Sequence, residues 1–284
     1  MPLKPLALLL ALLLASCTAR AEILRGLAEK SALLGRPVPY SLYRPEDGGD
    51  ARLPVLYLLH GHGGNENDWL GVGGLADAIR ARPDLPPMLV VMPGLGNSWY
   101  VDSAAFGPVA TAFLEEFVPA VEARWNGDPG NRAIAGLSMG GFGALHLALR
   151  APAMFDAVGA FSPAILAPGS RIDAVQLRLF GAAFGDPFDR RRFDRADPFR
   201  LLQRLPAATR LPAFYLMSGD DDEFGLEMGT IRFYLALREI GKRPELRIRD
   251  GGHRWPLWRR ELPAFLAFLG RRRGAGPADP TPRD

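Results

Sequence analysis

The chain of 284 residues has little cysteine and little histidine. Its single cysteine excludes an intramolecular disulfide, a cysteine-based zinc site and a cysteine-ligated iron–sulfur cluster. Four histidines leave little room for a metal centre built from several imidazoles. Lysine is also scarce, since only three of the 34 basic residues are lysines, and the arginines are scattered along the chain. The net charge of +3 therefore gives no indication of a nucleic-acid surface.

The overall composition is that of a folded protein. Apolar residues make up 48% of the chain and charged residues 23%, which is too apolar for a disordered chain. The length suits one large domain or two small ones. We expect one domain over residues 22–270, preceded by a signal peptide over residues 1–21 and followed by a disordered tail over residues 271–284, which is rich in glycine, proline and charge.

The amino terminus has the pattern of an export signal. An apolar stretch over residues 6–15 follows a charged start and is too short for a membrane-spanning helix. The segment Leu-Ala-Ser-Cys that ends at Cys17 resembles the lipobox of bacterial lipoproteins, in which the cysteine becomes the lipidated first residue. An Ala-x-Ala site at residues 19–21 offers ordinary cleavage before Glu22 as the alternative. Both predict an exported protein, either anchored to the cell envelope at Cys17 or released.

The remaining chain alternates between predicted strands and predicted helices. Short apolar runs predict strands over residues 38–43, 54–59, 88–92, 132–137, 157–161, 213–218 and 245–249. Helical spacing of apolar residues predicts helices over residues 75–82, 109–125, 141–150, 230–240 and 262–269. This alternation predicts a mostly parallel sheet with helices on both faces. Residues 164–211, called the excursion below, have no obvious strand and are expected to pass over one end of the sheet.

A candidate nucleophile lies in residues 136–140, Gly-Leu-Ser-Met-Gly, which match the pattern G-x-S-x-G. The match follows a predicted strand and opens a predicted helix, the context in which a strained turn exposes the serine hydroxyl. Side chains beside Ser138 would collide in such a turn, which accounts for the glycines. Gly141 and Gly143 extend the space for close packing of helix against strand. A plain glycine-rich turn is the alternative.

A serine hydroxyl needs a base that takes its proton, and His253 is the remaining candidate. In folds of this kind the order along the chain is serine, acid, histidine. His60 and His62 precede Ser138, and His146 lies about two turns along the following helix. His253 instead lies in a glycine-rich loop between a predicted strand and a predicted helix. An exposed loop histidine without function is the alternative.

The acid of such a site is expected in residues 220–223, Asp-Asp-Asp-Glu, which follow an apolar strand. A carboxylate there could reach the far nitrogen of the histidine and hold its tautomer. The residues alone do not choose among the four acids, and most of such a run is normally solvated. Clustered carboxylates could also bind a cation, but the alternating spacing and distal glutamate of a calcium loop are missing.

The predicted site also needs two backbone donors for an oxyanion. One is expected at the amide of Met139, and the other in residues 60–64, His-Gly-His-Gly-Gly, directly after a predicted strand. The amide of His62 is the candidate there, while His60 is expected to brace the loop. A pair of metal ligands at His60 and His62 is the alternative, but no third ligand is near in the sequence.

Five blocks of the chain, over residues 60–69, 96–100, 136–145, 218–224 and 251–258, together resemble the esterase D-like family of α/β-hydrolases. The family includes S-formylglutathione hydrolases, feruloyl and acetylxylan esterases, and mycolyltransferases of the antigen 85 type. The resemblance covers about residues 35–270. It implies an α/β-hydrolase fold, a catalytic Ser-His-Asp triad and no metal or organic cofactor.

The resemblance also chooses among the candidate acids. The family's acid is usually the third residue after the glycine of a G-x-x-D pattern, which places it at Asp222 when Gly219 is that glycine. Asp221 remains the alternative. The family's oxyanion donors correspond to His62 and Met139.

Aromatic residues flank the predicted site and are candidates for binding substrate. Trp99, Tyr100 and Trp255 are the candidates for substrate binding, and a place in the core is the alternative for each. The excursion adds a set of phenylalanines with the same two interpretations: Phe180, Phe184 and Phe188.

These features together predict an exported serine carboxylic-ester hydrolase that works through an acyl-enzyme. Export argues against glutathione thioesters and leaves small-molecule or carbohydrate esters as expected partners. Alternatives are an acyltransferase that uses the same triad, a serine peptidase, and a non-catalytic envelope binding module on a hydrolase scaffold.

Overall fold

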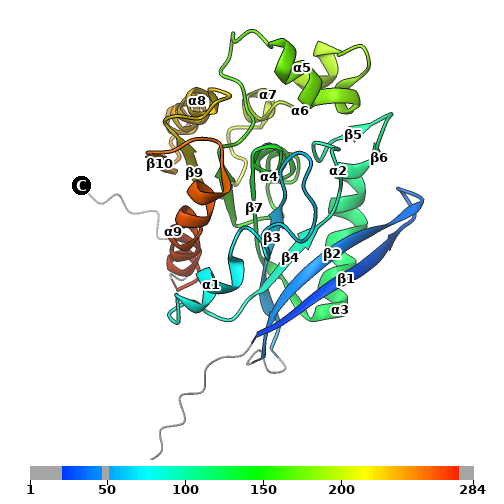
Figure 1. The fold of residues 1–284 in the computed structure, drawn as a ribbon, viewed down its shortest axis with the longest axis vertical. Coiled ribbons are helices and arrows are strands. Elements are labelled where there is room, and N and C mark those ends of the chain that lie inside the picture. Colours follow the sequence, from blue (N-terminus) through cyan, green and yellow to red (C-terminus); the bar gives the residue numbers. More distant parts are fainter. Residues whose placement is uncertain (1–20, 47–50, 275–284) are drawn as a thin grey trace, which may run out of the picture.

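In the computed structural model, residues 21–46 and 51–274 are described, and an eight-stranded sheet forms the centre of the molecule (Figure 1). The strand order is β1-β2-β4-β3-β7-β8-β9-β10. Strand β2 is antiparallel to both neighbours, and the strands from β4 to β10 are parallel. The bounds are β1 (Ala21–Ser31), β2 (Arg36–Pro45), β3 (Leu53–Leu59), β4 (Leu89–Pro93), β7 (Gly127–Leu137), β8 (Ala157–Phe161), β9 (Ala213–Gly219) and β10 (Glu245–Arg249). The chain has the α/β-hydrolase fold, as predicted.

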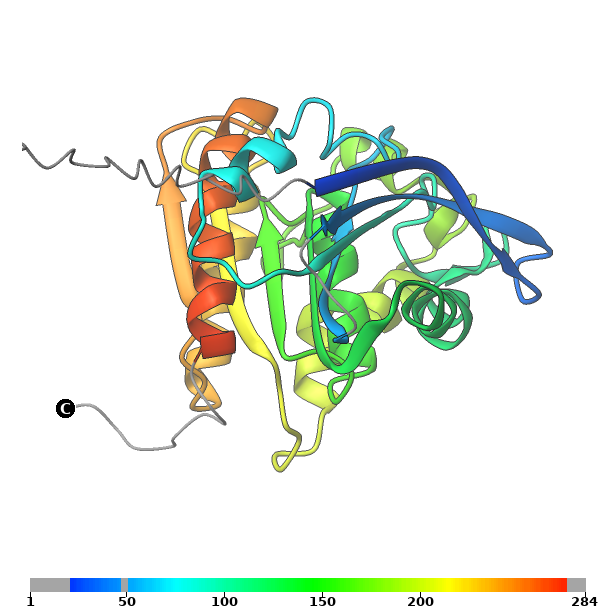
Figure 2. The same cartoon turned by 90° about the horizontal axis from the view of Figure 1, so that it is seen from below.

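Helices cover both faces of the sheet because the central strands are apolar on both sides. In β3, Tyr57 and Leu59 belong to one buried cluster, while Leu56 and Leu58 belong to the cluster on the opposite face. Figure 2 shows α1 and α9 together on one side of the sheet. These helices are α1 (Leu75–Arg80) and α9 (Trp255–Gly274), and the other face carries α2 (Val109–Ala112), η2 (Phe113–Phe117), α3 (Val118–Trp125), α4 (Met139–Arg150) and α8 (Leu226–Glu239).

The excursion is helical and, as predicted, has no strand. Its elements are α5 (Ala174–Phe180), η3 (Gly181–Phe184), α6 (Arg190–Ala196) and α7 (Pro198–Arg204). They lie beyond the end of the sheet, near the two short strands β5 (Asp102–Ser103) and β6 (Gly107–Pro108) (Figure 1). The phenylalanines of the excursion pack on one another, so this segment has a small apolar core of its own: Phe180, Phe184, Phe188 and Phe193.

Two elements near the ends of the chain differ from the predicted secondary structure. Strand β1 was not predicted, and it begins at Ala21, the last residue assigned to the signal peptide. Helix α9 is much longer than the predicted helix over residues 262–269, and it continues into the predicted disordered tail. Arg271 in that extension pairs with Glu245 of β10 at 3.0 Å, which ties the last turns of the helix to the sheet.

Some predictions fall outside the described residues. Residues 1–20, with the predicted lipidation site Cys17, and residues 275–284 belong to this part of the chain. Among the residues that the structure does describe, none of the helices is both long and apolar enough to cross a membrane.

Candidate active site

Ser138 lies in the turn between β7 and α4, with a backbone conformation that non-glycine residues rarely adopt (φ 53°, ψ −118°). The turn is so tight that a Cβ atom on Gly136 would lie 2.4 Å from the carbonyl oxygen of Gly140. A Cβ atom on Gly140 would lie 2.6 Å from the carbonyl oxygen of His60. The two glycines are therefore required by contacts with backbone, and they hold the serine at the amino-terminal end of α4.

His253 and Asp222 form a hydrogen-bonded pair beyond the ends of β10 and β9. Nδ1 of His253 lies 2.8 Å from Oδ2 of Asp222, and the side chain of Asp222 is completely buried. The imidazole is packed edge-to-face between the rings of Phe224 and Trp258, at centroid distances of 5.0 and 4.9 Å. Because Nδ1 donates to the carboxylate, Nε2 is the ring nitrogen that can take a proton.

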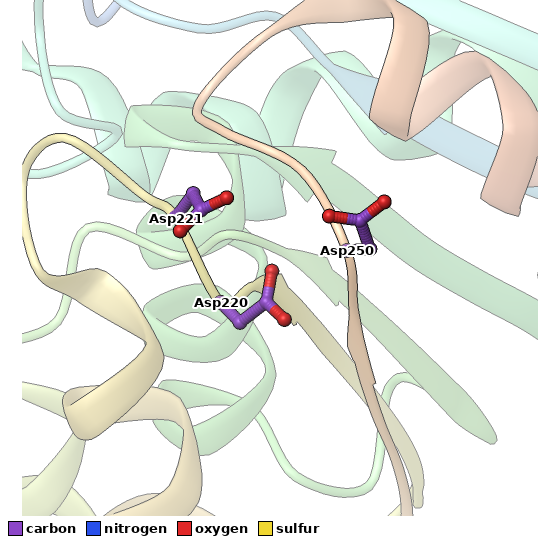
Figure 3. A group of neighbouring side chains, drawn as sticks. All are labelled: Asp220, Asp221 and Asp250. Atoms are coloured by element: carbon purple, nitrogen blue, oxygen red, sulfur yellow. The ribbon is translucent and has the colours of Figure 1, made fainter.

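The neighbouring acids of the run are exposed and do not contact the imidazole. Figure 3 shows Asp220 and Asp221 beside Asp250, and the three side chains offer carboxylate oxygens within 4.8 Å of one another. Asp220 also accepts a hydrogen bond from the amide of Gly251, so it links the two loops that follow β9 and β10. The structure therefore brings Asp222, and not Asp221, to His253.

Glu223, the last acid of the run, has a structural role that the sequence analysis missed. Its Oε2 accepts a hydrogen bond of 2.7 Å from the amide of His253, and its Oε1 accepts bonds of 2.9 and 2.6 Å from the Arg254 guanidinium. The hydrogen bond from the His253 amide and the contact with Arg254 lower the pKa of Glu223 to about 2. An arginine directly after the candidate histidine was the signal in the sequence that could have indicated this pairing.

The loop of residues 60–64 packs directly against the serine turn. A Cβ atom on Gly61 would lie 3.6 Å from the Cβ of Ser138, so the loop passes beside the candidate nucleophile. Nδ1 of His60 donates to the carbonyl oxygen of Gly61 at 2.8 Å, and its Nε2 accepts the amide of Leu95 at 3.3 Å. Burial lowers the pKa of His60. A neutral His60 therefore braces the loop, as predicted, and has no ring nitrogen left for a metal.

The predicted substrate-binding role of Tyr100 is wrong, because this side chain is completely buried beneath the loop. Its hydroxyl donates to the carbonyl oxygen of His60 at 2.9 Å, and its ring packs on Gly143, where a Cβ atom would lie 2.3 Å from Cδ2. Trp99 and Trp255 do line the cavity at the site. The indole of Trp99 is held there by a hydrogen bond of 3.0 Å to the carbonyl oxygen of Leu179.

Ser138 and His253 line one cavity of about 650 Å³. Its walls come from the loop of residues 60–64, the excursion and the start of α9. His62 lies at this cavity, and partial burial lowers the pKa of its imidazole. Of the three phenylalanines considered in the excursion, Phe180 lines the cavity, whereas Phe184 and Phe188 pack behind it. The apolar lining consists of Trp99, Leu137, Ala164, Leu166, Leu179, Phe180, Phe224, Leu226, Trp255, Pro256 and Trp258.

Curated relatives of this chain are esterases. An endo-1,4-β-xylanase/feruloyl esterase of Xylanibacter ruminicola is 34% identical over 163 residues, covering 52% of this chain and 22% of that protein. This chain thus spans about a fifth of the length of that relative. An acetyl esterase of Caldicellulosiruptor saccharolyticus is 28% identical over 241 residues, covering 80% of this chain and 86% of the relative.

Solved structures and a family model lead to the same group. A ferulic acid esterase structure superposes with a TM-score of 0.75 at 29% identity, covering 89% of this chain and 98% of that one. An S-formylglutathione hydrolase from Agrobacterium tumefaciens has the same fold, with a TM-score of 0.71 at 22% identity over 90% of this chain and 96% of its own. The Esterase family model matches residues 31–269. The chain belongs to the Esterase family.

Proposed function

We propose that this chain hydrolyses carboxylic esters, with Ser138 as nucleophile, His253 as general base and acid, and Asp222 as the residue that orients His253. One observation carries the proposal: a serine held in a strained turn and a histidine already paired with a buried carboxylate line the same cavity. Membership of the Esterase family supports it.

In the first half of the proposed reaction the ester acylates the serine. Oγ of Ser138 attacks the ester carbonyl carbon while Nε2 of His253 takes the hydroxyl proton, and Asp222 stabilises the resulting imidazolium. The amides of His62 and Met139 are the proposed donors to the oxyanion, and the second lies at the positive end of α4. When the tetrahedral intermediate collapses, the carbon–oxygen bond to the alcohol breaks and the alcohol leaves with the proton from His253.

In the second half water releases the acid. His253 takes a proton from a water molecule that attacks the acyl-serine, and the same two amides hold the second oxyanion. The collapse breaks the bond to Oγ, and His253 returns its proton to Ser138. The enzyme ends in its starting state, with one ester and one water converted to one acid and one alcohol.

The lining of the cavity favours an ester whose acyl group is apolar and aromatic. Trp99 and Phe180, the last residue of α5, both line this space, and their rings contact each other edge-to-face at a centroid distance of 4.8 Å. An aromatic ring gains both apolar burial and edge contacts against such a wall. The structural similarity to a ferulic acid esterase supports the same class, and a phenolic ester of a carbohydrate is the proposed natural substrate.

The test uses p-nitrophenyl esters of increasing chain length together with methyl ferulate. Ser138→Ala is expected to remove nearly all hydrolysis, leaving the residual effect of substrate binding and oxyanion stabilisation. Full activity in that variant would contradict the proposal. Product analysis with a carbohydrate acceptor present separates hydrolysis from acyl transfer, since an acylated carbohydrate would form only by transfer.

The identity of the acid is tested by a matched pair of variants in the same loop. Asp222→Asn is expected to lower kcat by roughly 10⁴-fold, the loss known for the same change of the acid in a serine-protease triad. Asp221→Asn removes one exposed negative charge and is expected to keep kcat within about twofold. A large loss in Asp221→Asn with normal activity in Asp222→Asn would assign the acid to Asp221.

Export is a further part of the proposed function. The amino-terminal sequence supports a protein that leaves the cytoplasm, with Cys17 as the site of a lipid anchor. β1 begins four residues after Cys17, at Ala21. Cleavage before either Cys17 or Glu22 would therefore leave nearly the whole of β1 in the mature protein.

A further inference from the structure

A second hollow, of about 610 Å³, lies between the excursion and the β5–β6 hairpin. Its walls are α4, the β5–β6 hairpin, η3 and α6, and Figure 1 shows α6 above this hairpin. It shares no lining residue with the catalytic cavity. The proposed ester chemistry uses none of the groups in this hollow.

Positive charge dominates the lining of this hollow. Arg150 is neutralised there by Asp102, at 2.6 Å. The other two guanidiniums come from α6, where Arg192 has a long contact of 3.3 Å with the half-exposed Asp189. Within the described residues, no acidic side chain forms an ion pair with Arg195. The guanidinium groups of Arg192 and Arg195 are therefore available to bind an anion in this hollow.

A buried acceptor without a partner lies in the wall of the same hollow. His146 of α4 is 4% exposed, and its Nδ1 donates to the carbonyl oxygen of Ala196 at 2.9 Å. Its Nε2 is buried and makes no hydrogen bond in the described part of the chain. Burial lowers the pKa of His146 to about 4, so the ring is neutral near pH 7 and Nε2 carries a lone pair. Buried polar atoms are rarely left unpaired, so this nitrogen suits a donor from outside the chain.

We propose that this hollow binds a hydroxylated organic anion, such as a uronic acid or a sugar phosphate. The anionic group would contact Arg195 and Arg192, and a hydroxyl of the ligand would donate to Nε2 of His146. Pro108, a partly buried residue that also lines the hollow, offers an apolar surface for the carbon skeleton. The guanidinium fork suits both carboxylate and phosphate oxygens.

The hollow and the catalytic cavity are separate but share a wall. His146 follows Ser138 by eight residues on one helix, which is about 12 Å along its axis. Between them Phe142 stacks on His146 at 6.0 Å and contacts Trp99 edge-on at 5.4 Å, and Trp99 lines the catalytic cavity. Ser138 does not line the hollow, so the substitution Ser138→Ala leaves the residues that line it unchanged.

The test is a calorimetric titration of the full chain carrying Ser138→Ala. Four probes are compared: methyl glucuronoside, glucose 6-phosphate, methyl glucoside and inorganic phosphate. Either anionic sugar is expected to bind. The one that binds more tightly shows whether the hollow recognises the carboxylate of a uronic acid or the phosphate of a sugar phosphate. Methyl glucoside and inorganic phosphate are each expected to bind at least about tenfold more weakly, because the glucoside has no anionic group and phosphate has no sugar hydroxyls or carbon skeleton. Equal binding of methyl glucoside or of inorganic phosphate would overturn the proposal.

Variants of α6 and of the rim locate the bound probe. Arg195→Ala is expected to weaken the anionic sugars at least about tenfold, whereas Arg191→Ala, on the same helix but outside the hollow, stays within about twofold. Ala104→Trp, which fills the hollow from an exposed loop position, is expected to abolish binding. Unchanged affinity in Arg195→Ala would overturn the proposal. So would competitive inhibition of p-nitrophenyl acetate hydrolysis in the unsubstituted chain, because the probe would then occupy the catalytic cavity.

Discussion

At the scale of single residues, the proposed chemistry depends on how tightly His253 is held. Three groups fix it: the buried carboxylate of Asp222 at Nδ1, the rings of Phe224 and Trp258 on either side, and Glu223 at the backbone amide. The first two act on the imidazole, whereas Glu223 acts on the loop that carries it. We therefore expect Glu223 to act as a positioning residue, whose contribution to activity can be separated from that of Asp222.

Glu223→Ala is expected to lower kcat by about 10- to 100-fold, because the amide of His253 and the Arg254 guanidinium lose their common acceptor and the base moves away from its working position. Steady-state kinetics on p-nitrophenyl acetate measure the change, with KM expected to move little. Glu223→Gln should recover part of the loss, since its amide oxygen can still accept from the His253 amide. An unaltered kcat in Glu223→Ala would show that the loop holds its shape without this contact.

The sequence was most informative about the candidate site where a residue type was scarce or a motif was rigid. Four histidines and a known chain order were enough to choose His253, and the glycines beside Ser138 indicated a tight turn. The choice among four adjacent acids depended on resemblance, because burial distinguishes Asp222 from its neighbours and burial is not visible in a run of like charges. The same ambiguity hid Glu223.

At the scale of elements, the strands buried on both faces were predictable and so was the edge strand β10, whereas the opposite edge strand, β1, was not. β1 pairs only with β2 and is mostly exposed, so it lacks the apolar run that revealed the central strands. A bulge between Leu24 and Leu27, with Gly26 at φ 68°, also breaks its alternation. α9 extends beyond its predicted bounds because packing of Leu262, Phe265 and neighbouring residues against the sheet outweighs Pro263 in its interior.

The predicted helix over residues 109–125 illustrates a subtler limit. It is continuous but contains a π-helical segment, η2, which ends two residues before Pro119. Proline has no amide hydrogen to donate to the preceding turn, and a wider turn is one way to accommodate this loss. Spacing of apolar residues predicted the helix and its buried face but does not carry information on such local irregularity.

Tyr100 connects the segment of residues 96–100 to the loop of residues 60–64, because its hydroxyl hydrogen-bonds the backbone of that loop. Tyr100→Phe removes the hydroxyl that donates to the buried carbonyl of His60 but keeps the ring against Gly143. The free energy of unfolding is expected to fall by about 1–3 kcal/mol, the cost of an acceptor left buried without a partner. kcat should fall as well, because the loop carries the proposed oxyanion donor His62.

Denaturant unfolding and ester kinetics together measure this effect. Tyr234→Phe is the matched control, since its partly exposed hydroxyl only accepts from Arg238 on the same helix, at 2.9 Å. The control is expected to change stability by less than about 0.5 kcal/mol. Equal effects of the two substitutions would mean that Tyr100 does not support the loop in the way described.

At the scale of the whole molecule, the dependence of stability on pH is expected to depend on one carboxyl group in the excursion. Asp197 lies between α6 and α7, and its side chain accepts the amide of Phe199 as the amino-terminal cap of α7. Burial raises its pKa to about 6, more than the cap lowers it. In the folded protein, the carboxyl group of Asp197 therefore stays protonated up to a higher pH than the carboxyl group of an ordinary aspartate.

Asp197→Asn is accordingly expected to stabilise the protein at neutral pH. A carboxyl whose pKa is about 6 when folded and 3.8 when unfolded stabilises the fold below pH 3.8, and this contribution is lost as the pH rises through about 6. Asparagine keeps the cap and has no charge to bury. The gain in unfolding free energy should approach about 2–3 kcal/mol at pH 7.5 and fade towards pH 4. Urea titrations at pH 7.5, 6 and 4.5 measure it, and a difference between variant and unsubstituted chain that stays constant across these pH values would refute the assignment.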